Sequence, residues 1–305
     1  MARYAIKRVA LAVLTILVVT TITFFLMNMV PGGPFISEKA MTAEAMAALN
    51  AKYGLDQPIP VQFAKYVQNI FKGDFGDSLK QRGRTVMSII TSKFPVSARL
   101  GGISVVVALV LGIPLGSVAA LNRGKWLDNL IRVFATFGIA VPSFVLCNIT
   151  MYFFGVRLGW FPTFGLTSPL HYILPVFSLA FYPTAYIARL MRSSMLDVLG
   201  QDYMRTAQAK GLSRFKMLFK HALRNAVLPV VTYIGPLVAY TLTGSFVVEK
   251  IFSVPGLGKE FVSAITNRDY TMIMGTTIFL AVLLIVINVL VDFAYKAIDP
   301  RIKLQ

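Results

Sequence analysis

The sequence has few charged residues and a single cysteine. Charged side chains make up 14% of its 305 residues, whereas a soluble domain carries about a quarter. These charges lie between apolar blocks, a pattern that is typical of a membrane protein and excludes one large soluble core. Cys147 lies inside an apolar block, so no disulfide can form within the chain, and we expect this thiol to be a packing residue.

Acidic residues are scarcer than basic ones. The chain has 13 aspartates and glutamates against 30 lysines and arginines, and its formal net charge is +17. Such a charge can indicate nucleic-acid binding. Here, however, the basic residues flank apolar segments and form no aromatic-laced stripe, so we predict no nucleic-acid partner.

Motifs for catalysis, nucleotides and metals are missing. The nearest match to a phosphate-binding loop, 253–261, has Ser253 in place of the first glycine and Glu260 in place of the hydroxyl residue. His171 and His221 fall on opposite membrane faces of the topology argued below, which predicts no metal site. No serine, histidine and aspartate set converges either. We therefore expect no catalytic residue, metal or cofactor in this chain, and no enzymatic activity.

Long uncharged stretches are what the chain does have. About 20 helical residues, at about 1.5 Å each, cross a hydrocarbon core of about 30 Å. Six stretches meet this length, and we predict an all-α membrane protein with six transmembrane helices. The fourth is the shortest and extends through Arg189 and Arg192 if those side chains reach the headgroups. The stretches are 9–30, 100–121, 133–156, 172–188, 226–248 and 270–291.

The distribution of lysine and arginine predicts the orientation. With the N-terminus inside, the inner segments hold 17 of the 30 basic residues, and nine of the outer 13 lie in the long segment 31–99. Long segments cross the membrane largely regardless of their charge. Both termini are therefore predicted to be cytoplasmic. The first helix follows a basic start but has no cleavage site, so we expect it to be retained rather than removed as a signal peptide.

The outer segment is predicted to be a small helical unit. Residues 42–55 have the pattern of a short helix ending at Gly54, and 61–76 that of a second, amphipathic helix stopped by glycines. The unit is either a solvated cap or a docking surface for a partner. The expected organisation is an N-terminal helix 1–30, an extracellular segment 31–95, a membrane-spanning core 96–298 with a cytoplasmic loop 199–228, and a cytoplasmic tail 299–305.

The centres of the predicted spans contain no ionisable side chain, which argues against an ion-coupled carrier. Asn148 and Asn288 are the most polar residues deep in spans. They either form hydrogen bonds between helices or line a passage. Glycines and prolines in 111–117, 137–144 and 233–237 indicate either close packing or kinked helices around a passage.

The loop between the fourth and fifth spans is strongly basic. Its apolar residues recur at helical spacing on both sides of Gly211, so we predict a helix–glycine–helix hairpin on the cytoplasmic face. Anionic lipid would attract it at about 1 kcal/mol per basic residue, but lipid binding does not require the glycine break. The basic residues are Arg205, Lys210, Arg214, Lys216, Lys220 and Arg224.

This loop resembles the coupling loop, or EAA loop, of ABC importer membrane subunits. Ala207 and Gly211 match the second alanine and the glycine of that motif, while Arg205 and Thr206 replace its glutamate and first alanine, as in the peptide/nickel branch. Nearly the whole chain is similar to the B-type subunits of oligopeptide permeases. The further stretches that carry the resemblance are 29–35, 52–67, 73–79, 94–100, 254–270 and 299–302.

The resemblance implies a type I ABC importer permease fold in a bacterial inner or plasma membrane. It also implies a homologous second permease, two cytoplasmic ATPases that bind ATP and magnesium, and an extracellular or periplasmic solute-binding protein. The residues expected to contact an ATPase are Arg205, Thr206, Ala207, Lys210, Gly211, Leu212 and Arg214. Those expected at the outer mouth, against the binding protein, are Pro255, Gly256, Leu257 and Gly258.

The implied substrate is an oligopeptide. Permeases for dipeptides, glutathione and nickel chelates have similar sequences and remain alternatives. A stand-alone channel or secondary carrier is the rival from another class, but neither explains the coupling-like loop, and inverted repeats are not evident. A membrane enzyme would need a cluster of catalytic groups near an interface, which the sequence lacks.

Overall fold

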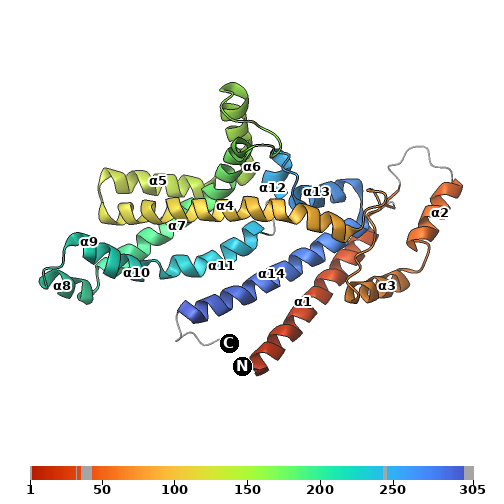
Figure 1. Ribbon diagram of the computed structural model, residues 1–305, viewed down its shortest axis with the longest axis horizontal. Helices are drawn as coiled ribbons and strands as arrows, with labels where there is room; N and C mark the ends of the chain where they lie inside the picture. The colour runs from red at the N-terminus through yellow and green to blue at the C-terminus, as the bar shows by residue number, and fades with distance from the viewer. Residues whose placement is uncertain (1, 32, 36–42, 243–245, 299–305) are drawn as a thin grey trace.

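The computed structural model describes residues 2–31, 33–35, 43–242 and 246–298, and Figure 1 shows that these are nearly all helical. The predicted tail 299–305 lies outside the described residues. Within them, the β structure consists of one isolated bridge between Asp77 and Thr85. The α-helices are α1 (Ala2–Met29), α2 (Ala43–Tyr53), α3 (Ile59–Phe71), α4 (Val86–Leu121), α5 (Trp126–Ala140), α6 (Ser143–Thr150), α7 (Ile173–Leu199), α8 (Asp202–Ala209), α9 (Arg214–Lys216), α10 (Leu223–Ala226), α11 (Leu228–Leu242), α12 (Phe246–Ile251), α13 (Leu257–Asn267) and α14 (Tyr270–Ile298).

Three shorter helices join these elements. Two are π-helices, η1 (Met151–Arg157) and η3 (Met217–Ala222), and η2 (Pro169–Tyr172) is a 3₁₀-helix. Among the described residues, five segments are long and apolar enough to span a membrane, and a bent helix pair brings the number to six. The predicted all-α membrane class is thus confirmed.

The third predicted span is not one straight helix. α5 ends at Ala140, and the segment that starts with α6 continues at 106° to it. Val141 has an extended backbone (φ −77°, ψ 122°), because the residue before a proline is driven out of the α-helical region. Pro142 also lacks the N–H that would continue the helix. α6 consequently points away from the α4–α5 direction (Figure 1).

α4 and α7 pack against each other over much of their length and form the centre of the molecule. Gly116 permits this approach: a Cβ atom there would lie 2.6 Å from Cβ of Met191. Ile187 and Met191 are fully buried in the resulting core, together with Ala108. Because the packed surfaces are apolar and small residues lie between them, the two helices form one rigid pair.

The outer segment and the core share a helix. α4 begins at Val86, where the Thr85 hydroxyl accepts the Ser88 N–H at 3.1 Å, as an N-cap does. The predicted boundary at 95/96 falls inside α4, so this helix continues from the outer segment into the core. Pro95 is tolerated there within a continuous helix.

The two outer helices occur close to where they were predicted. α2 ends before Gly54, and α3 ends before Gly73; both glycines have positive φ angles, +66° and +75°. α3 packs on α1 through Phe63 and Phe24, whose ring centroids are 5.2 Å apart. At the other end of α1, Arg8 forms an ion pair with Asp292 of α14, and α1 and α14 run side by side (Figure 1).

Most connections between the long helices lie at the two ends of the bundle, whereas α6 projects from its side (Figure 1). The α4–α5 turn and the segment α8–α10 are at one end, while α2, α3 and α13 are at the other. This arrangement is the one expected of a chain that crosses a membrane repeatedly, and it places the two kinds of loop on opposite faces.

Candidate functional site

The basic loop folds as predicted from its spacing. α8 is followed by Gly211 with φ +70°, and α9, η3 and α10 continue the chain back toward the bundle. A left-handed backbone suits glycine because it lacks a Cβ atom. No other atom lies within 4 Å of a Cβ built at Gly211, so the glycine is needed for the backbone angle and not for packing within this chain.

The loop is anchored firmly on α7. Met204 of α8 and Ala222 and Ala226 of the return segment are buried in the same apolar cluster as Met191 and Met195. Displacement of the loop must therefore move α7, because a close-packed cluster transmits strain rather than absorbing it.

Ala207 belongs to this internal packing as well. Only 7% of its surface is exposed. Its side chain therefore presents little surface to another protein in this conformation, and its predicted contact with an ATPase remains a prediction.

The outer surface of the loop is basic and aromatic. Of the predicted contact residues, Arg205, Thr206, Lys210 and Gly211 are exposed and Leu212 is half-buried. The side chain of Arg214 lies outside the described residues. Arg205 pairs with Asp202 of the same helix at 3.7 Å.

Sequence reasoning missed the aromatic part of this surface. Phe215 and Phe219 are 69% and 57% exposed, and their ring centroids are 4.4 Å apart. Their i, i+4 spacing predicts that they share a face. Their exposure could not be predicted, because apolar periodicity alone normally indicates a buried face.

A buried ion pair connects the α4–α5 turn to α7. Asp128, 1% exposed, accepts two hydrogen bonds from the Arg192 guanidinium and one from the Gly124 N–H. The fourth span does extend through Arg189 and Arg192, since α7 continues to Leu199, and the charge of Arg192 is matched by Asp128 within the chain.

A cavity of about 540 Å³ is lined by prolines from three segments of the bundle. Pro142 stands at the α5–α6 break, Pro183 in α7 and Pro236 in α11, and all three line the cavity. Prolines leave backbone carbonyls without their helical partners. The wall of this cavity therefore offers polar backbone groups as well as side chains.

Tyrosines form the other part of the cavity wall. Tyr182, Tyr233 and Tyr240 line it, and Tyr186 stacks against both Tyr182 and Tyr233, with centroid distances of 6.2 and 4.5 Å. Tyr182 and Tyr240 are largely exposed. A tyrosine presents an apolar ring and a hydroxyl that can donate or accept a hydrogen bond, so the wall can accommodate a solute that carries amide groups.

The two asparagines singled out from the sequence do not come together. Asn148 is on α6, where its side-chain amide donates to the Phe144 carbonyl of the same helix at 2.7 Å. Within the part of the chain that the structure describes, the hydrogen bond of this amide stays inside its own helix. Asn288 is half-buried on α14. Neither asparagine lines the cavity of the three prolines, and a passage role for them remains a prediction.

The predicted outer-mouth motif is mostly internal. Pro255 is exposed, but Gly256, Leu257 and Gly258 are buried. These three residues therefore present little surface to a binding protein in this conformation, and their predicted contact remains a prediction. They instead form the start of α13, around a carboxylate that the sequence did not point to.

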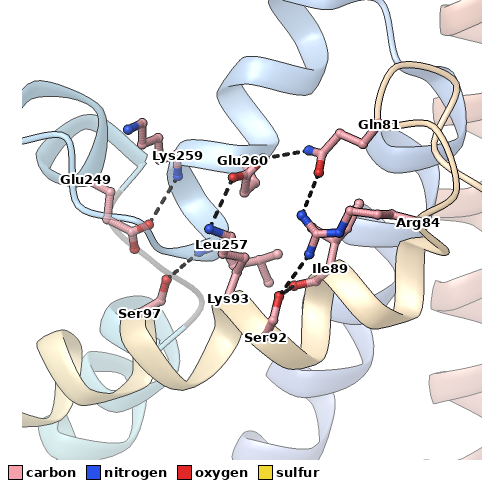
Figure 2. Close-up of polar contacts among 10 residues, drawn as sticks. All are labelled: Gln81, Arg84, Ile89, Ser92, Lys93, Ser97, Glu249, Leu257, Lys259 and Glu260. Carbon is pink, nitrogen blue, oxygen red and sulfur yellow. Dashed lines mark hydrogen bonds and ion pairs between the residues drawn. The ribbon is translucent and has the colours of Figure 1, made fainter. Parts of the chain in front are cut away.

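That carboxylate belongs to Glu249 of α12, which is 1% exposed. Figure 2 shows it facing the first turn of α13, where its Oε2 accepts the Lys259 N–H at 3.1 Å. The Ser97 hydroxyl of α4 accepts the Leu257 N–H at 2.8 Å. A negative group is favourable at a helix N-terminus, so Glu249 and Ser97 together attach α13 to α12 and α4.

A second row of contacts ties α13 to the start of α4 (Figure 2). Glu260 lies 3.6 Å from the Lys93 ammonium and accepts a hydrogen bond from the Gln81 amide at 3.1 Å. In addition, buried Asp269 accepts the Leu79 N–H at 3.1 Å and the Ser78 hydroxyl. The outer loops thus form one continuous structure over the bundle.

Metal-binding groups do not gather in this chain: in the part that the structure describes, no three His, Cys, Asp or Glu residues are placed to hold an ion. The side chains that do converge are hydrogen-bonding and aromatic. They can bind and orient a solute or hold helices together.

Comparison with known proteins gives two family matches. The family described as binding-protein-dependent transport system inner membrane component matches residues 112–304. The family of the N-terminal part of such membrane components matches residues 1–101.

Curated relatives match over the full length. The dipeptide transport system permease protein DppB of Bacillus subtilis (strain 168) is 50% identical over 305 residues, covering 100% of this chain and 99% of the relative. The oligopeptide transport system permease protein OppB of Haemophilus influenzae is 43% identical, covering 99% and 100%.

Among solved structures, a chain of the MetNI methionine ABC transporter, in inward-facing conformations, aligns with a TM-score of 0.54. The alignment has 19% identity and covers 70% of this chain and 95% of that one. At this identity the likeness concerns the fold, which is that of an ABC importer permease.

Proposed function

The chain belongs to the family of binding-protein-dependent transport system inner membrane components, and we propose that it forms one half of a passage through which an ATP-driven importer moves peptides. The observation that carries the substrate class is the full-length identity of 50% and 43% to permeases named for dipeptide and oligopeptide transport. A permease subunit is also the role that fits a chain with several apolar spans.

The proline-lined cavity is the proposed half-passage. Its tyrosines and freed carbonyls suit a peptide, whose backbone supplies hydrogen-bond donors and acceptors at every residue but whose side chains vary. Tyr182 and Tyr240 are exposed on the single chain. A homologous second permease, facing this side, would close the passage around the solute.

The surface of α8, Gly211 and the Phe215–Phe219 pair is the proposed contact with a cytoplasmic ATPase. It is exposed, basic and aromatic, and its base is packed into the α7 core. In this proposal ATP and magnesium bind to the two ATPases. Their closure would push on the loop and move α7, which carries Pro183 and Tyr182 of the cavity wall.

The proposed orientation places both termini and the α8–α10 segment in the cytoplasm. Support comes from the excess of basic residues on that side and from the placement of loops at the two ends of the bundle. The outer loops would then face the solute-binding protein, with Pro255 as the exposed residue of its turn.

Reconstitution tests the proposal. The full chain is purified in mild detergent, its co-purifying subunits are identified by mass spectrometry, and the assembly is placed in proteoliposomes with its binding protein. Uptake of a labelled dipeptide, tripeptide and pentapeptide is then measured with and without ATP. We expect ATP-dependent uptake of at least one of these peptides, and the series defines the accepted length.

The rival class makes a different prediction. A stand-alone channel or secondary carrier would purify alone or as a homo-oligomer and would move solute without ATP. That result would reject the importer assignment. Recovery of a second permease and ATPases, but uptake of a non-peptide solute alone, would retain the importer and reject the peptide substrate.

A further inference from the structure

A second cavity, of about 300 Å³, lies at the outer end of the bundle, away from the proposed passage. Its walls come from the end of α1, the α2–α3 pair, the strap 74–79 and the start of α14. None of the residues discussed for solute transport lines it. The inference drawn from it therefore does not depend on which solute the importer carries.

The cavity has an apolar floor and a polar rim. Phe24 and Met27 of α1 and Met274 of α14 contribute the apolar surface. Lys52, Lys65, Asp74 and Asp77 contribute charges of both signs. A ligand that satisfies both parts must be amphipathic and must carry a positive and a negative group.

One side chain in the cavity lacks a partner. The hydroxyl of Tyr66 is buried and has no hydrogen bond within the described residues. Burial raises the pKa of this phenol, so it stays protonated and remains a donor. A buried donor without an acceptor costs about 1–3 kcal/mol, and an acceptor on a bound ligand would remove that cost.

The surroundings of the cavity are apolar on the outside as well. α3 exposes Ile59, Val61 and Phe71, the last by 80%, beside the outer end of the first span. An amphipathic helix with such a face lies in the boundary between lipid headgroups and acyl chains. The cavity is therefore located where a phospholipid can enter it.

We propose that this cavity holds one phospholipid with a zwitterionic headgroup that contains a primary amine. The phosphate accepts hydrogen bonds from the Tyr66 hydroxyl, Lys52 and Lys65. The ammonium group lies against Asp74 and Asp77, and part of an acyl chain covers the apolar floor. A headgroup with a phosphate and no amine would leave the two aspartates facing a negative ligand, which is unfavourable.

Photolabelling tests the site. The full chain, with the subunits that co-purify, is mixed in detergent with phosphatidylethanolamine bearing a diazirine on its acyl chain, and the labelled peptides are mapped by mass spectrometry. We expect label on the peptides that contain Met27 and Met274. Unlabelled phosphatidylethanolamine should compete about tenfold better than phosphatidylglycerol, and equal competition would overturn the zwitterionic assignment.

Matched variants test the position. Met27→Trp should fill the cavity and lower the labelling about tenfold, whereas Met29→Trp, two residues along the same helix and 75% exposed, should leave it unchanged. Tyr66→Phe removes the donor without changing the shape and should lower the labelling about tenfold. Thermal unfolding in detergent checks that each variant folds. If Tyr66→Phe labels like the parent chain, the phosphate is not bound there and the proposal fails, whatever the fate of Met27→Trp.

Discussion

Arg192 holds Asp128 through two parallel hydrogen bonds, from Nε to Oδ1 at 2.6 Å and from Nη2 to Oδ2 at 2.8 Å. A two-point pair of this kind fixes orientation as well as distance. It joins α5 to α7 at the end of the bundle from which the α8–α10 segment projects. We therefore expect it to help transmit force from that segment to the helices.

Replacing Arg192 by methionine should lower both stability and transport. The carboxylate of Asp128 would keep the Gly124 N–H but lose two charge-assisted hydrogen bonds, a loss of about 2 kcal/mol. The thermal unfolding temperature in detergent and the ATP-dependent uptake rate are the measurements.

The double variant Asp128→Asn with Arg192→Met is the control for that prediction, because it removes the uncompensated charge. It should recover part of the lost unfolding temperature, since groups in direct contact do not behave additively. Equal effects of the single and double variants would contradict an energetic link between the two side chains.

Gly211 should tolerate asparagine but not valine. Its φ of +70° is accessible to asparagine and strongly disfavoured for a β-branched residue, and no atom of this chain crowds the site. Gly211→Val should therefore abolish ATPase retention in a pull-down, while Gly211→Asn retains it. Loss of the ATPase from both variants, at normal membrane insertion, would mean instead that the partner packs directly against the glycine.

The spans and the glycine break were predictable from sequence for a physical reason. A span needs only length and the absence of charge, and a left-handed turn between helices nearly always takes a glycine. The same local reasoning failed at Val141 and Pro142. Prolines also lie inside the continuous helices α4, α7 and α11. The sequence therefore shows the positions at which a helix can break, but it does not distinguish Pro142, where the helix does break, from the prolines that a helix accommodates.

The polar contacts between distant helices were not predictable. Glu249 directly follows a predicted span, yet it accepts a hydrogen bond from the Lys259 N–H of α13. Asp128 and Arg192 are also far apart in the chain and belong to different helices. A single sequence contains no local pattern that reports such pairing, because it depends on how the helices are packed.

Gly256→Ala should disrupt the attachment of α13. A Cβ at this position would lie 2.5 Å from the Ser97 hydroxyl oxygen and 2.8 Å from Cδ of Glu249, and neither buried group has room to move. We expect a lower unfolding temperature and increased cleavage of the outer loop by added protease. Gly124→Ala offers a comparison, since nothing lies within 4 Å of its Cβ, although its φ of +76° adds strain. Gly256 itself has a φ of −94° and gains no such strain, so equal protease sensitivity of both variants would show general destabilisation and not loss of the contact with Glu249.

Glu249→Gln should weaken the same attachment without a change of shape. The neutral amide loses the favourable interaction of a negative charge with the α13 N-terminus, about 0.3–2 kcal/mol. If the amide is oriented with its NH₂ group toward the Lys259 N–H, two donors face each other and the hydrogen bond to Lys259 is lost as well. Unfolding temperature and ATP-dependent uptake should both fall, and Glu249→Ala should lower them further because it leaves a cavity. Unchanged behaviour of Glu249→Gln would show that the charge of this carboxylate is not needed.

Substitutions in the proline-lined cavity should separate binding from assembly. Tyr240 is 65% exposed and lines the cavity, so Tyr240→Ala removes wall surface with little effect on the fold of this chain. We expect normal recovery of the other subunits, normal ATPase activity and a peptide uptake rate reduced by about tenfold, because the solute loses an aromatic and hydrogen-bonding contact along its path. Tyr240→Phe keeps the ring and should retain more of the rate. The loss from tyrosine to phenylalanine measures the contribution of the hydroxyl, and the further loss from phenylalanine to alanine measures that of the ring.

Tyr152→Ala, on the exposed surface of the π-helix η1 and outside the cavity, is the matched control. Uptake that falls equally for Tyr152→Ala and Tyr240→Ala would place the passage elsewhere in the assembly.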